Sequence, residues 1–333
     1  MAPVLELTGL EVTFPTDEGD VSAVRGVDLA IDPGRILGVV GESGSGKTVT
    51  MLAVLGLLPS TARVAGSVRF EGREVLGLAP RELRKLRGAR IGMIFQDPKT
   101  SLNPVQTIGH QIVEGIRIHH PDVTRKEAAR RAVDLLALVG IPQPDRRARD
   151  YPHQFSGGMC QRAMIAMAVA NDPAVLVADE PTTALDVTIQ AQILDLLREI
   201  RREKDVAIVL ISHDLGVVAG MADDVSVMYA GRVVERGSVD DVYAHPRHPY
   251  TQGLLASIPR LTDDARAPLR SIGGGAPSLL HLPAGCAFHP RCPHGRPNCS
   301  VDDPRLRPVA SVRVACHYAE DLGPVAAAPA SPG

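Results

Sequence analysis

The sequence predicts an α/β fold built on a mainly parallel sheet, and three observations support this expectation. Apolar runs of strand length alternate with amphipathic runs of helix length, and the connections between them are short. Residues 4–14 and 21–31 alternate apolar and polar side chains on either side of a polar turn, which predicts an antiparallel β subdomain before the parallel sheet. The 333 residues suffice for one large α/β domain with an appendage or for two modest domains.

The other elements follow in chain order from the same patterns. Further strands are expected at residues 66–75, 91–95, 174–179 and 206–211, with a last strand-and-turn unit at 225–237. Helices are expected at residues 81–87, 126–140, 159–172 and 189–203. The second helix can be capped by the Thr124 hydroxyl, and its apolar face is expected to consist of Ala128, Ala132, Leu135, Leu136 and Val139.

Composition excludes several classes of function. Aromatic residues make up 3% of the chain, Trp is absent and the net charge is −2, so neither a stacking platform nor a basic surface for nucleic acid is expected. No apolar run approaches about 18 residues, so we expect no membrane span. The N-terminal residues MAPVLELTGLEVTF lack a basic region followed by an apolar core, so we expect no signal peptide and a cytoplasmic chain.

A glycine-rich loop follows the apolar run ILGVV and precedes a helical run. It matches the pattern G-x-x-x-x-G-K-[ST] through Gly41, Glu42, Ser43, Gly44, Ser45, Gly46, Lys47 and Thr48. Glycines let successive backbone N–H groups turn inward around a polyphosphate, and the helix adds its positive N-terminal end. Lys47 is expected to reach the β- and γ-phosphates and Thr48 to ligate Mg²⁺, so the chain is expected to bind a nucleoside triphosphate.

Two more motifs complete a hydrolytic site. Asp179 and Glu180 end a buried apolar strand, where Asp179 can hold the metal and Glu180 can polarise the attacking water. Ser156 can cap a helix whose first turn contains Gly157 and Gly158, which leaves bare N–H groups and a positive helix end for an anion from another molecule.

These motifs, in this order and spacing, resemble those of the ATP-binding subunits of ABC transporters. The resemblance implies a RecA-like P-loop NTPase fold with an antiparallel β subdomain, a helical insert and a C-terminal extension that contains cysteines. It implies that Ser156 to Met159 is the signature that contacts the γ-phosphate bound by the partner subunit. Further roles that it implies are the Walker B aspartate for Asp179, the catalytic glutamate for Glu180, the Q-loop glutamine near Mg²⁺ for Gln96, the D-loop for Ala184 to Asp186, the switch histidine for His213 and adenine stacking for Phe14.

Longer segments narrow the resemblance to the oligopeptide, dipeptide and nickel importers. They are FQDPKTSLNP at residues 95–104, YPHQFSGGM at 151–159, MYAGRVVERG at 228–237 and HPRHPYTQGLLASIP at 245–259. The organisation that this implies is an ATPase domain at residues 4–255 with a helical insert at about 97–165, an extension at 256–320 and a disordered tail at 321–333. The expected cargo is short peptides, with nickel or another small solute as the alternative within this branch. A soluble non-transport ABC ATPase and an exporter ATPase are the rivals from other classes.

The same resemblance implies a set of partners. Two ATPase subunits, paralogous or identical, are expected to face each other head to tail with ATP between one phosphate loop and the opposite signature. Two permease subunits should dock on the insert around Asp97–Gln111, and an extracytoplasmic protein should bind the cargo. The chain is thus expected at the cytoplasmic face of the cell membrane.

Four of the five cysteines lie in the last fifth of the chain, at Cys286, Cys292, Cys299 and Cys316. In a reducing cytoplasm a disulfide framework is not expected, and four thiolates suit either an iron–sulfur cluster or tetrahedral Zn²⁺. The resemblance implies a 4Fe-4S cluster, with Zn²⁺ and unliganded thiols as alternatives. Cys160 stands where a basic or polar residue is expected in the family and is interpreted as a tolerated replacement.

Overall fold

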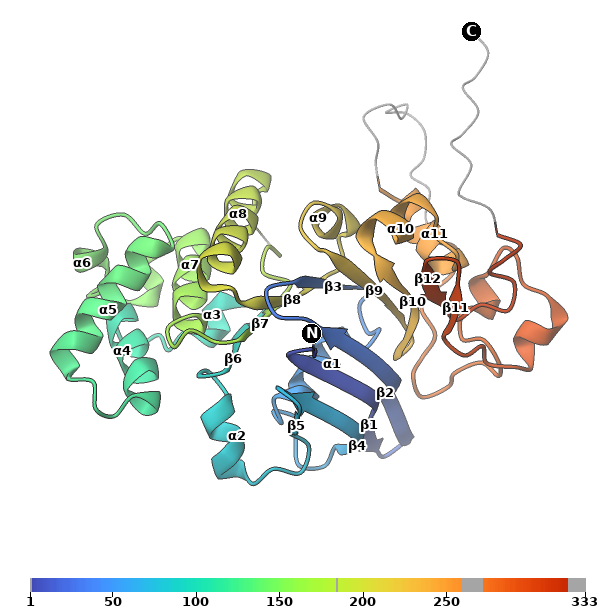
Figure 1. Cartoon of the computed structure of the whole chain (residues 1–333), viewed down its shortest axis with the longest axis horizontal. Coiled ribbons are helices and arrows are strands. Elements are labelled where there is room, and N and C mark those ends of the chain that lie inside the picture. The colour runs from blue at the N-terminus through green and yellow to red at the C-terminus, as the bar shows by residue number, and fades with distance from the viewer. Residues whose placement is uncertain (1, 184, 259–271, 323–333) are drawn as a thin grey trace, which may run out of the picture. The chain divides into compact units, whose positions relative to one another are not determined.

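The computed structural model describes residues 2–183, 185–258 and 272–322 (Figure 1). The chain forms two compact units, the first from residues 1–6, 30–36 and 69–211 and the second from residues 7–29, 37–68 and 212–333. Each unit collects segments that are far apart in the sequence, so the functional residues are distributed over both.

The first unit contains three parallel strands, β6 (Ile91–Ile94), β7 (Val175–Asp179) and β8 (Ala207–Ser212). β7 pairs with β6 on one side and with β8 on the other. Every residue of β7 and β8 is buried. Parallel strands covered on both faces need such continuous apolar runs, which explains why the sequence pattern revealed them.

Most of the helices of the first unit lie between β6 and β7. α2 (Pro80–Leu86) precedes β6, and α8 (Val187–Lys204) follows β7. The helices between β6 and β7 are α3 (Pro98–Ser101), α4 (Ile108–His119), α5 (Arg125–Leu138), α6 (Pro144–Arg147) and α7 (Gly157–Ala168). Helices α4, α5 and α7 pack against one another (Figure 1). Thr124 caps α5 by accepting a hydrogen bond from the Glu127 N–H, and the five apolar residues predicted to face inward are all buried.

The strand predicted at residues 66–75 is wrong as a single element. The chain forms β4 (Arg63–Phe70) and the short β5 (Arg73–Glu74), which pair antiparallel. Between them Glu71 and Gly72 take φ angles of 49° and 76°, so the chain reverses there. Gly72 was the signal in the sequence, because glycine favours the left-handed conformation that such a turn requires.

The second unit contains a hairpin and a mixed sheet. The hairpin strands β1 (Leu5–Thr16) and β2 (Gly19–Ile31) form one sheet with β4, in the order β2-β1-β4. In the mixed sheet β3 (Ile36–Val40) is parallel to β9 (Asp224–Tyr229), and β10 (Arg232–Ser238) is antiparallel to β9. The helices of this unit are α1 (Lys47–Val54), α9 (Leu215–Ala219), α10 (Val239–Ala244) and α11 (Pro249–Ala256).

The C-terminal extension adds two strands that the sequence did not predict. β12 (Val312–Val314) pairs with β10, and β11 (Arg307–Val309) pairs with β12 (Figure 1). Strands of three residues are too short to display an alternating pattern, so they were invisible in the sequence.

Two further findings concern the membrane and the tail. Over the described part of the chain, no helix combines the length and the hydropathy needed to cross a bilayer.

Leu322, at the start of the tail predicted to be disordered, is buried, and its carbonyl accepts a hydrogen bond from Arg247 Nη1 at 3.0 Å. Residues 323–333 of that tail lie outside the described residues.

Candidate functional site

The phosphate loop lies in the second unit, between the fully buried strand β3 and helix α1. Its first glycine, Gly41, has a φ of 154°, and a Cβ atom there would lie 2.2 Å from the Met228 carbonyl oxygen. Gly46 has a φ of 99°, and its Cβ atom would lie 2.5 Å from the Ala23 carbonyl oxygen. Both positions therefore exclude any side chain, and the loop presents bare backbone as a polyphosphate site requires.

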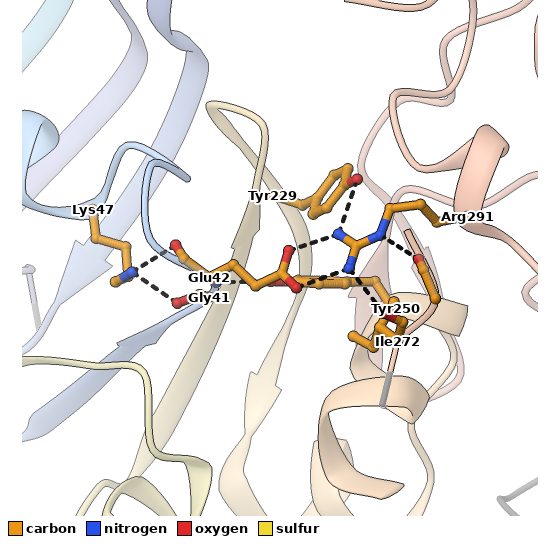
Figure 2. Close-up of polar contacts among 8 residues, drawn as sticks. Gly41, Glu42, Lys47, Tyr229, Tyr250, Ile272 and Arg291 are labelled. Atoms are coloured by element: carbon orange, nitrogen blue, oxygen red, sulfur yellow. Dashed lines mark hydrogen bonds and ion pairs between the residues drawn. The ribbon is translucent and has the colours of Figure 1, made fainter. Parts of the chain in front are cut away.

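Lys47 begins α1, and its side chain crosses the loop. The residue is 5% exposed. Its ammonium donates to the carbonyl oxygens of Gly41 at 2.8 Å and Glu42 at 3.0 Å (Figure 2). These contacts hold the ammonium against the carbonyl groups at the start of the loop, and its contact with the β- and γ-phosphates stays a prediction.

A cavity of about 600 Å³ opens beside the phosphate loop. Its lining residues are Thr16, Asp17, Glu18, Val21, residues 42–45, Tyr229, Ala230 and residues 276–280. This volume is of the size that nucleotide-sized ligands occupy. Phe14 lies half-buried in β1 and is absent from the described lining residues, so its stacking on adenine stays a prediction.

In the first unit, the structure brings Gln96 and Glu180 together. The Gln96 side-chain amide donates to Glu180 Oε2 at 3.0 Å, and the Thr183 hydroxyl donates to the same oxygen at 2.9 Å. Glu180 has a φ of 45°, which is strained for a residue other than glycine, and its N–H donates to the Ile211 carbonyl oxygen at 3.0 Å. Asp179, beside it at the end of β7, is 2% exposed. The strained backbone of Glu180 and the two hydrogen bonds to its carboxylate hold this side chain in one orientation, as a residue that must direct a reacting group requires.

The signature also lies in the first unit. Ser156 caps α7 by accepting a hydrogen bond from the Met159 N–H at 3.3 Å, which confirms the predicted cap. Ser156 and Gly157 are exposed, and a Cβ atom on Gly157 would meet nothing within 4 Å. The first turn of α7 is therefore accessible from outside this chain.

The remaining motif residues have simple local roles. Asp186 caps α8 through the Ile189 N–H at 3.0 Å, whereas Ala184 of the D-loop lies outside the described residues. His213 follows β8 and is exposed, in the unit that holds the phosphate loop. Cys160 is buried in α7 and its thiol donates to the Pro152 carbonyl oxygen at 3.5 Å, which supports a packing role.

The four cysteines of the extension line one small cavity of about 20 Å³, room for a single water-sized group. Four histidines share the lining, namely His248, His289, His294 and His317. Burial raises the pKa of Cys286 and of Cys316 to about 11, and neighbouring thiols add to both shifts. Over residues 2–183, 185–258 and 272–322, no three His, Cys, Asp or Glu side chains form a group that could hold a metal ion as they stand.

Sequence reasoning missed two residues that touch the phosphate loop. Arg291 forms an ion pair with Glu42, and the Tyr250 hydroxyl accepts the Glu42 N–H at 2.8 Å (Figure 2). Both stand in segments that resemble the peptide importers, HPYTQ and HPRCP, but those segments gave no hint of a role for either residue.

Comparisons with known proteins agree with these motifs. The family model described as ABC transporter matches residues 24–183, and the model described as the C-terminal region of oligopeptide/dipeptide transporters matches residues 234–299. The oligopeptide transport ATP-binding protein OppD of Mycobacterium tuberculosis is 53% identical over 317 residues, which are 95% of this chain and 52% of that protein. The chain thus spans about half the length of this mycobacterial relative.

Other relatives match over most of their length. OppD of Salmonella typhimurium is 51% identical over 301 residues, which cover 90% of this chain and 89% of that protein. A dimeric post-hydrolysis structure of the ATP-binding cassette MJ0796 with ADP and Pi has a TM-score of 0.64 and 28% identity, covering 71% of this chain and 98% of that one. The fold is therefore the ABC ATPase P-loop fold with a mixed sheet and an antiparallel β subdomain, as the sequence predicted. The chain belongs to the family of ABC transporter ATP-binding proteins, in the oligopeptide transport branch.

Proposed function

We propose that this chain is an ATP-hydrolysing subunit that energises import of short peptides through a membrane ABC transporter. The phosphate loop carries the proposal, because two of its glycines exclude any side chain and its lysine is buried among the carbonyls of the loop. Two relatives are named oligopeptide transport ATP-binding proteins, which supports short peptides as the cargo.

In this proposal each motif residue has a defined role. Lys47 and the loop N–H groups bind the β- and γ-phosphates. Thr48, Gln96 and Asp179 are each assigned to Mg²⁺, which would neutralise charge on the phosphates. Glu180 orients the attacking water and accepts its proton, with Gln96 and Thr183 fixing the carboxylate. His213 is the switch histidine, and Phe14 packs on adenine.

The site is completed by a second ATPase subunit. The exposed first turn of α7, with Ser156, Gly157 and Gly158, offers a helix N-terminus to the nucleotide of the partner, and Asp186 lies at the same interface. The partner is a paralogue or a second copy of this chain, and the dimeric structure of the MJ0796 cassette supports such pairing.

The other partners are two permeases and an extracytoplasmic binding protein. The permeases dock on the insert around Asp97–Gln111, where Val105 is 79% exposed. Val105 thus leaves an apolar side chain on the part of the surface that the permeases would cover. The chain therefore works at the cytoplasmic face of the membrane.

Replacing the water-polarising carboxylate tests the proposal. In the assembled transporter in proteoliposomes, Glu180→Gln should lower ATP turnover at least roughly 100-fold and abolish uptake of a labelled short peptide, because an amide cannot accept the proton. Glu199→Gln, on the exposed face of α8, is the matched control. Unchanged turnover in Glu180→Gln would show that the site on the partner ATPase carries the activity.

We also propose that Cys286, Cys292, Cys299 and Cys316 hold a 4Fe-4S cluster. Four thiols are the donor set that such a cluster takes, and all four line one cavity, although the described side chains would have to rearrange to hold it. Cluster binding would widen the cavity and deprotonate thiols whose pKa values are raised by burial, so assembly should release protons. Zn²⁺ bound by the same thiols is the alternative.

Anaerobic purification distinguishes these outcomes. A cluster predicts a brown protein that absorbs at about 400 nm, through thiolate-to-iron charge transfer. Cys292→Ser should lose this absorbance, while Cys160→Ser, which lies in the other unit, should keep it. A colourless protein with stoichiometric zinc and no iron contradicts the cluster.

A further inference from the structure

The C-terminal extension contacts the phosphate loop through one arginine. Arg291 Nη1 donates to Glu42 Oε2 at 2.7 Å and Nη2 donates to Glu42 Oε1 at 2.9 Å (Figure 2). The side chain of Arg291 is 6% exposed and that of Glu42 is 30% exposed. A planar, two-pronged pair this well shielded from water is the strongest ion-pair geometry that the two side chains can form.

Further contacts fix the guanidinium in place. Its Nε donates to the Gly273 carbonyl oxygen at 2.9 Å, and Nη1 lies 3.4 Å from the Tyr229 hydroxyl. Its Cζ lies 5.8 Å from the centroid of the Tyr229 ring and 5.9 Å from that of Phe288. The hydrogen bonds to Glu42 raise the pKa of Arg291 further above its ordinary value. Because the guanidinium is held from several sides, it can hold Glu42 in turn.

Glu42 is restrained at three points. Its N–H donates to the Tyr250 hydroxyl at 2.8 Å, its carbonyl oxygen accepts from Lys47 Nζ at 3.0 Å, and its carboxylate accepts from Arg291. Arg291 is thus linked to Lys47 through a single residue. Glu42 directly follows the first glycine of the phosphate loop, so the contacts to its side chain and to its backbone act on one residue of the loop.

The charge of Glu42 needs an explanation at this position. A carboxylate in a loop that receives a polyanion repels it, and the repulsion grows with the charge of the ligand. Arg291 neutralises that carboxylate. The ion pair therefore removes the repulsion between the loop and an anion, and the carboxylate remains the group through which Arg291 positions Glu42.

The extension approaches the same cavity at a second place. Residues 276–280 line the cavity together with loop residues 42–45. Gly19, at the start of β2, would place a Cβ atom 3.4 Å from Leu280 Cδ1. One part of the extension thus contacts the phosphate loop through Arg291, and another part lines the cavity beside the loop.

From these contacts we propose that Arg291 is a positioning residue of the nucleotide site, which acts through Glu42 on the affinity for the polyphosphate. The proposal rests on the proposed ATP binding. It assigns the extension a part in forming the nucleotide site itself, in addition to carrying the cysteines.

Nucleotide affinity in a set of charge variants of the full chain tests the proposal. Arg291→Ala should weaken MgATP binding roughly tenfold, and MgADP binding less, because the exposed carboxylate repels the triphosphate more strongly. The double variant Glu42→Gln with Arg291→Ala should recover to within about threefold of the wild type, since the uncompensated charge is gone. Arg291→Lys keeps the charge but loses the two-pronged hydrogen bonding. Its affinity for MgATP should therefore lie between those of the wild type and Arg291→Ala.

Two controls make each outcome decisive. Arg296→Ala breaks an exposed ion pair with Asp321 elsewhere in the extension and should leave affinity unchanged. Lys47→Ala should abolish binding, and if it does not, the proposed ATP binding itself is wrong. Wild-type affinity in a folded Arg291→Ala variant, or a double variant as weak as Arg291→Ala, overturns the role of Arg291 while ATP binding stands.

Discussion

At the scale of single residues, Glu235 in β10 shows how the fold accommodates a buried carboxyl group. The residue is fully buried, and its oxygens accept hydrogen bonds from the backbone N–H groups of Arg247 at 2.6 Å and His248 at 3.1 Å. Burial nevertheless raises its pKa from 4.5 to about 7. The carboxyl therefore fixes the turn before α11, the helix that carries Tyr250 to the phosphate loop.

The raised pKa predicts a pH dependence of stability. Between pH 4.5 and about 7 the folded chain binds more protons at Glu235 than the unfolded chain, so its contribution to the free energy of unfolding falls as pH rises. The free energy of unfolding of the wild type minus that of Glu235→Gln should therefore fall by about 3 kcal/mol across this range. Urea titrations at a series of pH values measure this difference. The exposed Glu199→Gln variant should show a flat difference, and a flat curve for Glu235→Gln as well contradicts the assignment.

At the scale of elements, three of the helices that the sequence predicted begin with a hydroxyl or carboxylate cap, whereas α4, α9 and α10, which also begin with such a cap, were not predicted. Thr124, Ser156 and Asp186 each accept a backbone N–H at the start of their helix. Such a cap stabilises its helix by about 1 kcal/mol wherever it stands. At Ser156 the proposal adds a second task, contact with the nucleotide of the partner subunit.

Comparing two caps separates these tasks. Ser156→Ala and Thr124→Ala should each lower the free energy of unfolding by about 1 kcal/mol, because each leaves an N–H group of its helix without the cap. ATP turnover of the assembled transporter should fall in Ser156→Ala alone, since α5 does not face a nucleotide in the proposed dimer. Stability comes from chemical denaturation and turnover from phosphate release. Equal turnover in the two variants would reduce Ser156 to a helix cap.

The same scale explains what could and could not be predicted from the sequence. The phosphate loop, Asp179, Glu180 and Ser156 are encoded locally, because a few adjacent residues impose the backbone conformation. The hydrogen bond between Gln96 and Glu180 was not predicted, since 84 positions separate the two residues. Arg291 and Tyr250 escaped detection because their effect on Glu42 depends on tertiary contacts across 249 and 208 positions.

At the scale of the whole molecule, the second unit is held together by contacts between its extreme segments. Asp303 of the extension accepts from Arg25 in β2 at 3.5 Å and from Arg232 in β10 at 2.6 Å. β12 pairs with β10 through Glu235 opposite Val314 and Arg236 opposite Arg313. The extension thus contributes to the sheet and to the ion pairs of the unit that contains the phosphate loop.

The pairing of β12 with β10 has a practical consequence for anyone who shortens the chain. Without residues 307–314, β10 would keep β9 on one side and lose its hydrogen-bonded neighbour on the other. The uncovered strand, with Val233 and Val234 beside free backbone amides, would offer a template for edge-to-edge association with other copies. Aggregation of a truncated chain would then report an unprotected sheet edge rather than the loss of the cysteines.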